Sequence, residues 1–267
     1  MITKFQIFND FIFEHKLHTN QIGLLNYIDK ISKNNLFIFV DTETTGLGGF
    51  KKQQLTQISA IAYEYNFNRN SLKKVGDFNK KIKISDDMIN RLEDPKDNIK
   101  DILKFNGYDK KIIGDSEYYD ELDTIKEFKN WISNLEYNLN PILIMQNAYF
   151  DMNMLVGRGR EKIIHEVLDT KQIIQLFVIP IVQKLAENNS EYVEILNKIG
   201  KSERDFGLIN SSMSKWGPFF DIDMSGYHDA LTDCKITSQM FIKIIDFIKE
   251  NINLNISKYQ VERIKIK

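Results

Sequence analysis

Residues 36–46 read LFIFVDTETTG, and this stretch decides the fold. Its first five residues are apolar without a break and include β-branched and aromatic side chains, a pattern typical of a strand buried on both faces. Asp41 and Glu43 follow two residues apart, so a continuing strand would place both carboxylates on one face. A glycine-rich turn comes next. The sequence therefore predicts a central strand that ends in an acidic pair.

Two further acidic motifs follow along the chain. Residues 142–146 form a second apolar run, and the segment NAYFD ends it at Asp151. If the two strands are parallel neighbours, their carboxyl ends meet and Asp151 approaches the first pair. Residues 228–233, HDALTD, open a helical pattern. On one helix His228 and Asp233 would lie about 140° apart, so we expect His228 in a loop and the helix to begin near Asp229.

Each motif has an ordinary explanation when it is taken alone. Asp41 and Glu43 could mark a solvated strand end, Asp151 a helix cap, and His228 a surface side chain. Together they supply the carboxylates and the histidine that a two-metal phosphodiester hydrolase needs. Crowded carboxylates raise each other's pKa, and a hard divalent cation relieves that repulsion. A histidine with an ordinary pKa of about 6.5 could take a proton from water.

The order of elements indicates one sheet with helices on both faces. The periodicity predicts strands over 36–41, 55–67, 78–84, 142–146 and 166–169. It predicts helices over 121–135, 152–157, 170–186, 190–199, 203–215 and 229–250, and Pro180 should kink or end the third of these. Within residues 1–35, the apolar side chains fall at helical spacing.

Composition narrows the class of protein. The chain has 267 residues, of which 42% are hydrophobic, and this is enough to fill a sizeable core. Its net charge of −1 argues against a protein that coats nucleic acid through a broad basic face. The single Cys234 fits a reducing compartment and should be a small core residue. We see no secretory signal and no membrane-spanning run, so we expect a soluble cytoplasmic protein.

The motifs resemble those of the DnaQ-like 3′→5′ exonucleases of the DEDDh group, which have an RNase H-like fold. That α/β fold is a mixed five-stranded sheet with helices on both faces. The resemblance spans residues 36–250 and runs through 40–47, 57–58, 147–151, 169–170 and 228–233. It implies that four carboxylates bind two Mg²⁺ or Mn²⁺ ions and that His228 is the general base. The implied metal ligands are Asp41, Glu43, Asp151 and Asp233. The tyrosine subgroup has Tyr four residues before the last acid, where this chain has Asp229.

The resemblance also implies contacts with the substrate. Thr44 would contact the 3′ end, and Leu47 would wedge beside the terminal base or else be a buried turn residue. Asn147 and Phe150 would complete the substrate-binding group. A basic group that begins at Arg158 and continues through residues 160 and 162 could reach phosphates or form a solvated helix face. Similarly, the aromatic pair at 219–220 could stack on bases or pack against the sheet.

Three functional hypotheses follow. The first is a 3′→5′ exonuclease that releases 5′-mononucleotides from DNA, similar to the proofreading subunit of bacterial DNA polymerase III. The second is an RNA exonuclease resembling oligoribonuclease or ribonuclease T. The third is a catalytically silent docking module of a replication complex. We expect an N-terminal helical extension (1–35) able to dock a polymerase or another replication protein, an exonuclease domain (36–250) and a polar, basic tail (251–267).

Overall fold

The computed structural model describes residues 20–91, 118–135, 139–159, 165–202 and 207–264, with side chains in the last stretch described up to Gln260. Most of the expected N-terminal extension, residues 1–19, lies outside the described residues. The same holds for residues 160 and 162 of the basic group. Among the described helices, none combines the length and the apolar character that a bilayer crossing requires.

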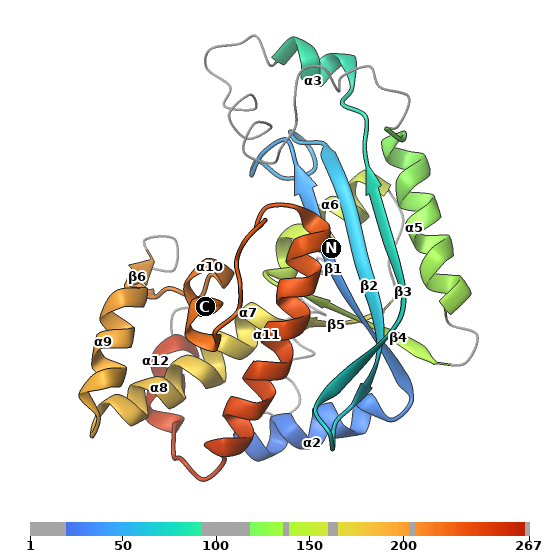
Figure 1. The fold of residues 1–267 in the computed structure, drawn as a ribbon. Coiled ribbons are helices and arrows are strands. Elements are labelled where there is room, and N and C mark those ends of the chain that lie inside the picture. The colour runs from blue at the N-terminus through green and yellow to red at the C-terminus, as the bar shows by residue number, and fades with distance from the viewer. Residues whose placement is uncertain (1–19, 92–117, 136–138, 160–164, 203–206, 265–267) are drawn as a thin grey trace.

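A mixed five-stranded sheet in the order β3-β2-β1-β4-β5 forms the centre of the molecule (Figure 1). β1 is antiparallel to β2 and parallel to β4, so the carboxyl ends of β1 and β4 lie at one edge. The strands are β1 (Asn35–Thr44), β2 (Leu55–Asn66), β3 (Ser71–Lys81), β4 (Asn140–Met145) and β5 (Glu166–Asp169). This topology confirms the predicted mixed sheet.

Helices cover both faces of this sheet. The described helical segments are α2 (Gln21–Ser32), α3 (Asp86–Arg91), α5 (Glu121–Leu135), α6 (Ala148–Gly159), α7 (Thr170–Ile173), η3 (Ile174–Val178), α8 (Ile179–Ala186), α9 (Ser190–Ile199), α10 (Met213–Trp216), η4 (Pro218–Phe220), α11 (Ala230–Glu250) and α12 (Ser257–Ile264). α5 and α11 have the predicted positions, and α6 begins four residues earlier than expected.

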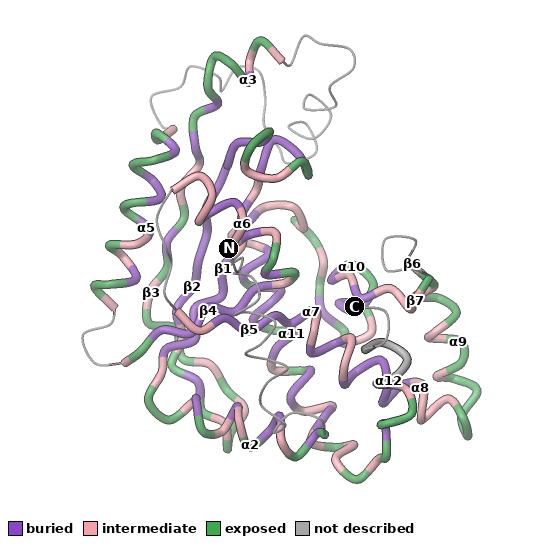
Figure 2. Tube along the Cα trace, turned by 180° about the vertical axis from the view of Figure 1, so that it is seen from behind, coloured by how far each residue is buried: buried purple, intermediate pink, exposed green. Residues whose placement is uncertain are grey.

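The apolar run of β1 is continuous because the strand is buried on both faces (Figure 2). Phe37 and Phe39 pack into one cluster with α2, α11 and the helix over 170–186. Ile38 and Val40 pack into a second cluster with α5 and α6. The sheet thus separates two cores, and its central strand contributes to each.

The third strand is displaced from its expected position. The sequence predicts 78–84, whereas β3 runs from Ser71 to Lys81. β3 is an edge strand that pairs only with β2 among the described strands, and most of its first half is exposed. Exposed edge positions carry Lys73 and Lys74 in place of an apolar alternation, so the periodicity misses them. α5 shows a smaller departure, because Leu122 on its predicted apolar face is 47% exposed.

The helix does not end at Pro180. The segment 170–186 is helical throughout, and the five residues before Ile179 form a π-turn. Proline cannot donate to the carbonyl four residues earlier, and that carbonyl belongs to Leu176. It accepts a hydrogen bond from Nε2 of Gln260 at 2.7 Å instead. The wider turn and the partner from α12 together accommodate the proline.

The segment between α9 and α11 differs from the predicted helix over 203–215. Its described part contains a short hairpin, β6 (Lys201–Ser202) and β7 (Leu208–Ile209), followed by α10 and η4. The aromatic pair at 219–220 packs inward: Phe220 is 7% exposed and its ring lies 6.0 Å from that of Phe247. The pair is thus packed in the interior, but its ring contacts are with α10 and α11 and not with the sheet.

Candidate active site

The first acidic pair lies at the carboxyl end of β1. Asp41 and Glu43 are both half-buried, and the strand extends through them to Thr44. Glu43 lies opposite Gln57 of β2, and the register shifts immediately after this pair. The shift ends the regular ladder where the glycine-rich turn begins. The strand therefore supplies two carboxylates on one face, as predicted.

Asp151 reaches the same edge from the first turn of α6. The turn into this helix requires a left-handed Asn147, with φ of 70°, a conformation that Asn tolerates. Asp169, at the end of β5, accepts hydrogen bonds from the N–H groups of Asn147 and Ala148 at 3.0 and 3.2 Å. These bonds fix the start of α6 beside β5. Asp151 is 3% exposed, and its Oδ1 accepts from the N–H and the hydroxyl of Thr42.

The third motif forms the start of α11 as the sequence predicts. Asp229 is the N-cap and accepts from the N–H of Thr232 at 3.1 Å. His228 precedes the helix in a left-handed conformation with φ of 77°. Its backbone N–H lies 3.3 and 3.4 Å from the two carboxylate oxygens of Asp233. The loop at His228 therefore turns around the carboxylate of Asp233, which projects from the start of α11.

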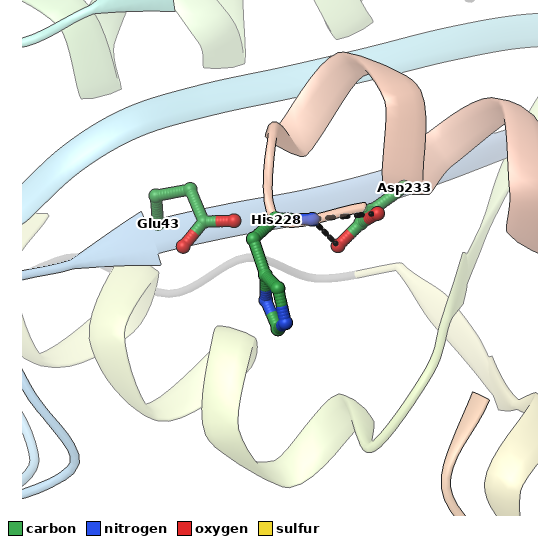
Figure 3. A group of neighbouring side chains, drawn as sticks. All are labelled: Glu43, His228 and Asp233. Atoms are coloured by element: carbon green, nitrogen blue, oxygen red, sulfur yellow. Dashed lines mark hydrogen bonds between the residues drawn. The ribbon is translucent and has the colours of Figure 1, made fainter. Parts of the chain in front are cut away.

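These segments bring their side chains to one place. A ligand atom from each of Glu43, His228 and Asp233 lies within 4.8 Å of the others, a spacing that could hold a metal ion (Figure 3). The charge of Asp151 raises the pKa of both Asp41 and Glu43, so these three acids lie close together. Residues separated by almost 200 positions in the sequence thus form one acidic group.

Burial raises the pKa of every carboxyl in this group, and the charges of neighbouring acids raise it further. Burial is the larger cause, and it raises the pKa of Glu43 to about 8 and those of Asp151 and Asp233 to about 7. The pKa of Asp41 also lies well above its ordinary value, through burial and then the charges of Asp151 and Asp233. A site that holds protons against such repulsion would bind a divalent cation in their place.

The histidine has a lowered pKa, because partial burial disfavours its charged form. Its imidazole ring lies 3.8 Å, between centroids, from the ring of Tyr227. Burial and then the charge of Asp233 raise the pKa of this tyrosine to about 12, so it stays protonated at neutral pH. The group therefore presents a neutral imidazole beside the acidic side chains at pH 7.

The four residues assigned to substrate contacts differ in exposure. Leu47 is 68% exposed at the turn after β1, so the alternative of a buried turn residue is wrong. Thr44 is buried, and its hydroxyl donates to the carbonyl of Gly46 at 2.8 Å. Asn147 is exposed, whereas Phe150 is half-buried and packs on the cluster between the sheet and α5. Their contacts with a substrate stay predictions.

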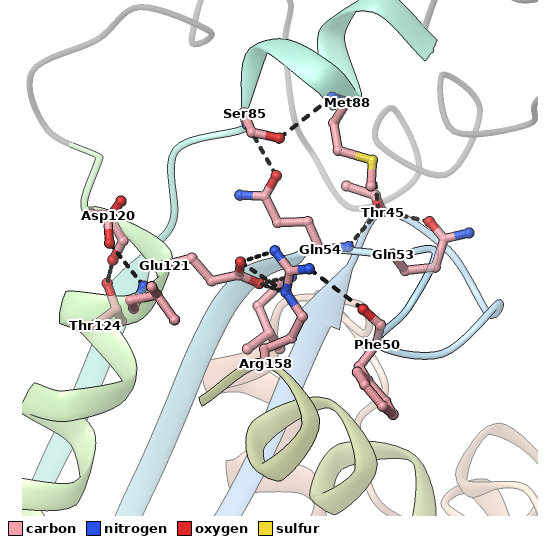
Figure 4. Close-up of polar contacts among 12 residues, drawn as sticks. Thr45, Phe50, Gln53, Gln54, Ser85, Met88, Asp120, Glu121, Thr124 and Arg158 are labelled. Carbon is pink, nitrogen blue, oxygen red and sulfur yellow. Dashed lines mark hydrogen bonds and ion pairs between the residues drawn. The ribbon is translucent and has the colours of Figure 1, made fainter. Parts of the chain in front are cut away.

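Arg158 does not form a solvated helix face. Its guanidinium pairs with the carboxylate of Glu121, with Nε lying 2.8 and 2.9 Å from the two oxygens (Figure 4). The same carboxylate accepts from the N–H of Leu55 at 2.9 Å, and Arg158 also donates to the carbonyl of Phe50. This pair connects α5, α6 and β2 to the loop 46–54. No local pattern in the sequence predicts this ion pair, because the two residues are 37 positions apart.

Neither a protein-family model nor a curated protein matches this sequence. The fold is similar to a chain of the ExoI/SSB-Ct complex, with a TM-score of 0.51, 15% identity, and coverage of 80% of this chain and 43% of that one. It is also similar to a 3′-exonuclease in a structure of 3′-end specific recognition of the histone mRNA stem-loop. There the TM-score is 0.51, the identity 10%, and the coverage 88% of this chain and 71% of that one.

A third similar structure is that of cell-death related nuclease 4. Its TM-score is 0.48 at 16% identity, and the match covers 80% of this chain and 64% of that one. This chain thus spans less than two thirds of both that nuclease and the ExoI chain. At these identities the similarity shows the fold, which is the RNase H-like arrangement that the motifs predicted.

Proposed function

We propose that this chain is a metal-dependent 3′→5′ exonuclease that hydrolyses single-stranded DNA to 5′-mononucleotides. One observation carries the proposal: Glu43, His228 and Asp233 lie within 4.8 Å of one another, and Asp41 and Asp151 are close enough to interact with the same group through their charges. A structural role explains such a group poorly, since each carboxylate destabilises its neighbours when no cation is present. The similar folds of two nuclease structures agree with the proposal.

The donor set fits a divalent cation such as Mg²⁺ or Mn²⁺. Carboxylate oxygens are the ligands that these hard ions prefer, and the raised pKa values show that the group resists carrying its full negative charge alone. We assign Asp41, Glu43, Asp151 and Asp233 as the residues that hold two ions. The ions would supply Lewis-acid stabilisation of the charge that develops at the scissile phosphate.

His228 is assigned as the general base. Its lowered pKa leaves the imidazole neutral at pH 7, where it can accept the proton of the attacking water. The left-handed backbone at this position and the contact of its N–H with Asp233 hold the residue at the edge of the group. Asp151, fixed by two hydrogen bonds from Thr42, would keep its carboxylate oriented during the reaction.

The assignment to the DnaQ-like family and to DNA rests on the motifs, since the similar structures include one with an mRNA stem-loop. An RNA exonuclease is therefore the alternative outcome of the test. A polymerase or another replication protein as partner of residues 1–35 is part of the same proposal.

Digestion of a 5′-labelled single-stranded DNA and of an RNA of the same sequence tests the proposal. Each should be incubated with Mn²⁺, with EDTA, and with the Asp41→Ala variant. A metal-dependent ladder that shortens from the 3′ end of DNA is expected, and it should be absent with the variant. Asp77→Ala, which removes an exposed acid on β3, is the matched control and should digest normally. Faster digestion of RNA would overturn the assignment to DNA. If neither DNA nor RNA is shortened, the proposal that this chain is an exonuclease is wrong.

A further inference from the structure

Gln57 is a buried polar residue beside the acidic group. It is 2% exposed and lies directly opposite Glu43 in the pairing of β1 with β2. Directly opposed residues project from the same face of a sheet, so Gln57 shares the face of Glu43 that α11 covers. A buried amide needs partners for both its carbonyl and its NH₂ group. These partners connect the sheet to the segment that carries His228 and Asp233.

Both the NH₂ group and the carbonyl of the Gln57 amide form hydrogen bonds with the start of α11. Its Nε2 donates to Oδ2 of Asp229 at 3.2 Å, and its Oε1 accepts from the N–H of Ala230 at 3.4 Å. The N–H of Ala230 belongs to the first helical turn and has no partner within the helix. Asp229 uses its other oxygen, Oδ1, for the cap to Thr232. One side chain therefore fixes both the capping residue and the first helical residue.

Gln57 is itself oriented from the opposite side. Its Nε2 donates to Oδ1 of Asn79 on β3 at 2.9 Å, and the hydroxyl of Ser59 donates to the same oxygen at 2.8 Å. The chain of contacts thus runs from β3 through β2 to the start of α11. Such a network holds a side chain in one position because each member restricts the next.

We propose that Gln57 is a positioning residue that fixes His228 and Asp233 relative to the carboxylates of β1. It acts through Asp229 and Ala230 and does not touch the reacting atoms. This inference rests on the proposed function. An amide is the side chain that suits this place, because it donates to a carboxylate and accepts from an N–H at once. Glutamate has the same shape but would put a second carboxylate against Asp229.

The test exchanges the hydrogen-bond donor and acceptor between Gln57 and Asp229. Gln57→Glu removes the donor and should lower kcat on the single-stranded substrate by about 10- to 100-fold, since a displacement of about 1 Å can cost about 100-fold. KM should stay within about twofold. Adding Asp229→Asn places an amide donor opposite the new carboxylate at position 57, and Asn is also a favourable N-cap. The double variant should therefore have a kcat at least tenfold higher than that of Gln57→Glu.

Gln54→Glu is the matched control. Gln54 is also buried, at 3% exposure, and its amide bonds the carbonyl of Lys83 and the N–H of Ser85, away from α11. This variant should change kcat by less than about threefold even if it lowers the melting temperature. Equal losses of kcat in the two single variants, or no recovery in the double variant, would overturn the proposal. A double variant that does not fold would overturn it as well.

Hydrogen exchange of the segment 226–234 gives a readout that is independent of activity. Gln57→Glu should accelerate exchange there by about tenfold, the double variant should restore protection, and Gln54→Glu should leave it unchanged. If the wild type cleaves neither DNA nor RNA, the proposed function fails while this measurement still decides whether Gln57 holds the segment. Unchanged exchange in Gln57→Glu would refute the positioning role even in an active nuclease.

Discussion

The Oδ1 atom of Asp151 accepts two hydrogen bonds from Thr42, one from the backbone N–H at 3.0 Å and one from the hydroxyl at 2.7 Å. This contact joins the first turn of α6 to β1, 109 residues earlier in the chain. It also opposes the effect of burial on the pKa of Asp151, because both bonds favour the charged form. If the proposed function holds, Thr42 thus keeps this carboxylate ionised for a divalent cation.

Thr42→Val tests this role, since it removes the hydroxyl and keeps the N–H donor. We expect the pKa of Asp151 to rise and the affinity for Mn²⁺ to fall about tenfold, because a hydrogen bond to a charged group contributes about 1.5–3 kcal/mol. Calorimetric titration with Mn²⁺ at pH 7 measures the change. Thr42→Ser retains a hydroxyl and should bind nearly as the wild type does. Equal affinities for the valine and serine variants would contradict the prediction.

The raised carboxyl pKa values make the metal-free protein sensitive to pH. In the folded state Glu43 keeps its proton up to about pH 8, and Asp151 and Asp233 up to about pH 7, whereas unfolded carboxyls lose theirs near pH 4. The folded state therefore binds more protons than the unfolded state over this window. The free energy of unfolding should fall as the pH rises from about 4 to about 8.

Urea unfolding in EDTA at pH 5 and at pH 8 measures this dependence. Stability should be lower at pH 8, and saturating Mn²⁺ should reduce the difference by binding the ionised, folded state. Asp233→Asn removes one of the repelling charges and should weaken the dependence on pH. A wild type that becomes more stable from pH 5 to pH 8 in EDTA would show that the carboxyls are not held protonated.

The parts of the fold that the sequence predicts well are those set by local pattern. The central strand carries an unbroken apolar run, and α5 carries a clear helical periodicity, so their positions agree with the structure. Likewise, the geometric argument that His228 must precede the helix holds, because it depends only on the helical repeat and on Asp229 as the cap. The approach of Asp151 to the first acidic pair followed from parallel pairing of β1 and β4.

The parts that the sequence does not predict depend on distant partners. α6 begins at Ala148 because Asp169, on another strand, holds the N–H groups that start it. From the sequence, Arg158 suggests a solvated basic side chain, because its partner Glu121 is distant along the chain. Similarly, Gln57 shows no local sign that its amide will meet α11, 172 residues later. Such contacts follow from the tertiary arrangement, which no local pattern encodes.

Arg158→Met should destabilise the protein, because it leaves the carboxylate of Glu121 buried without its partner. The side chain of Glu121 is 8% exposed, and removing one member of a buried pair costs about 3–5 kcal/mol. We expect a loss of about 3 kcal/mol in urea unfolding. Replacing both partners, as Arg158→Met with Glu121→Gln, should recover most of this loss, since the neutral amide leaves no buried charge and its carbonyl can still accept from the N–H of Leu55. If the double variant is no more stable than Arg158→Met, then the pair is not what stabilises this region.

The ring of Phe50 packs directly over Gly157 and joins the loop 46–54 to α6. A methyl group added at Gly157 would overlap the ring carbons. On an unobstructed helix Gly→Ala stabilises by about 1 kcal/mol. Here we expect Gly157→Ala to destabilise by about 1–3 kcal/mol, because the ring and its loop must move. The loop carries the exposed Leu47, so KM for a single-stranded oligonucleotide should rise as well.

The sign of this effect should reverse when the ring is removed. In a Phe50→Ala background the added methyl group meets no ring, so Gly157→Ala should stabilise by up to about 1 kcal/mol through helix propensity alone. A double-mutant cycle by urea unfolding therefore isolates the contact from the intrinsic preference of the helix. A stabilising Gly157→Ala in both backgrounds would mean that the ring moves aside freely and that it does not fix the loop beside β1.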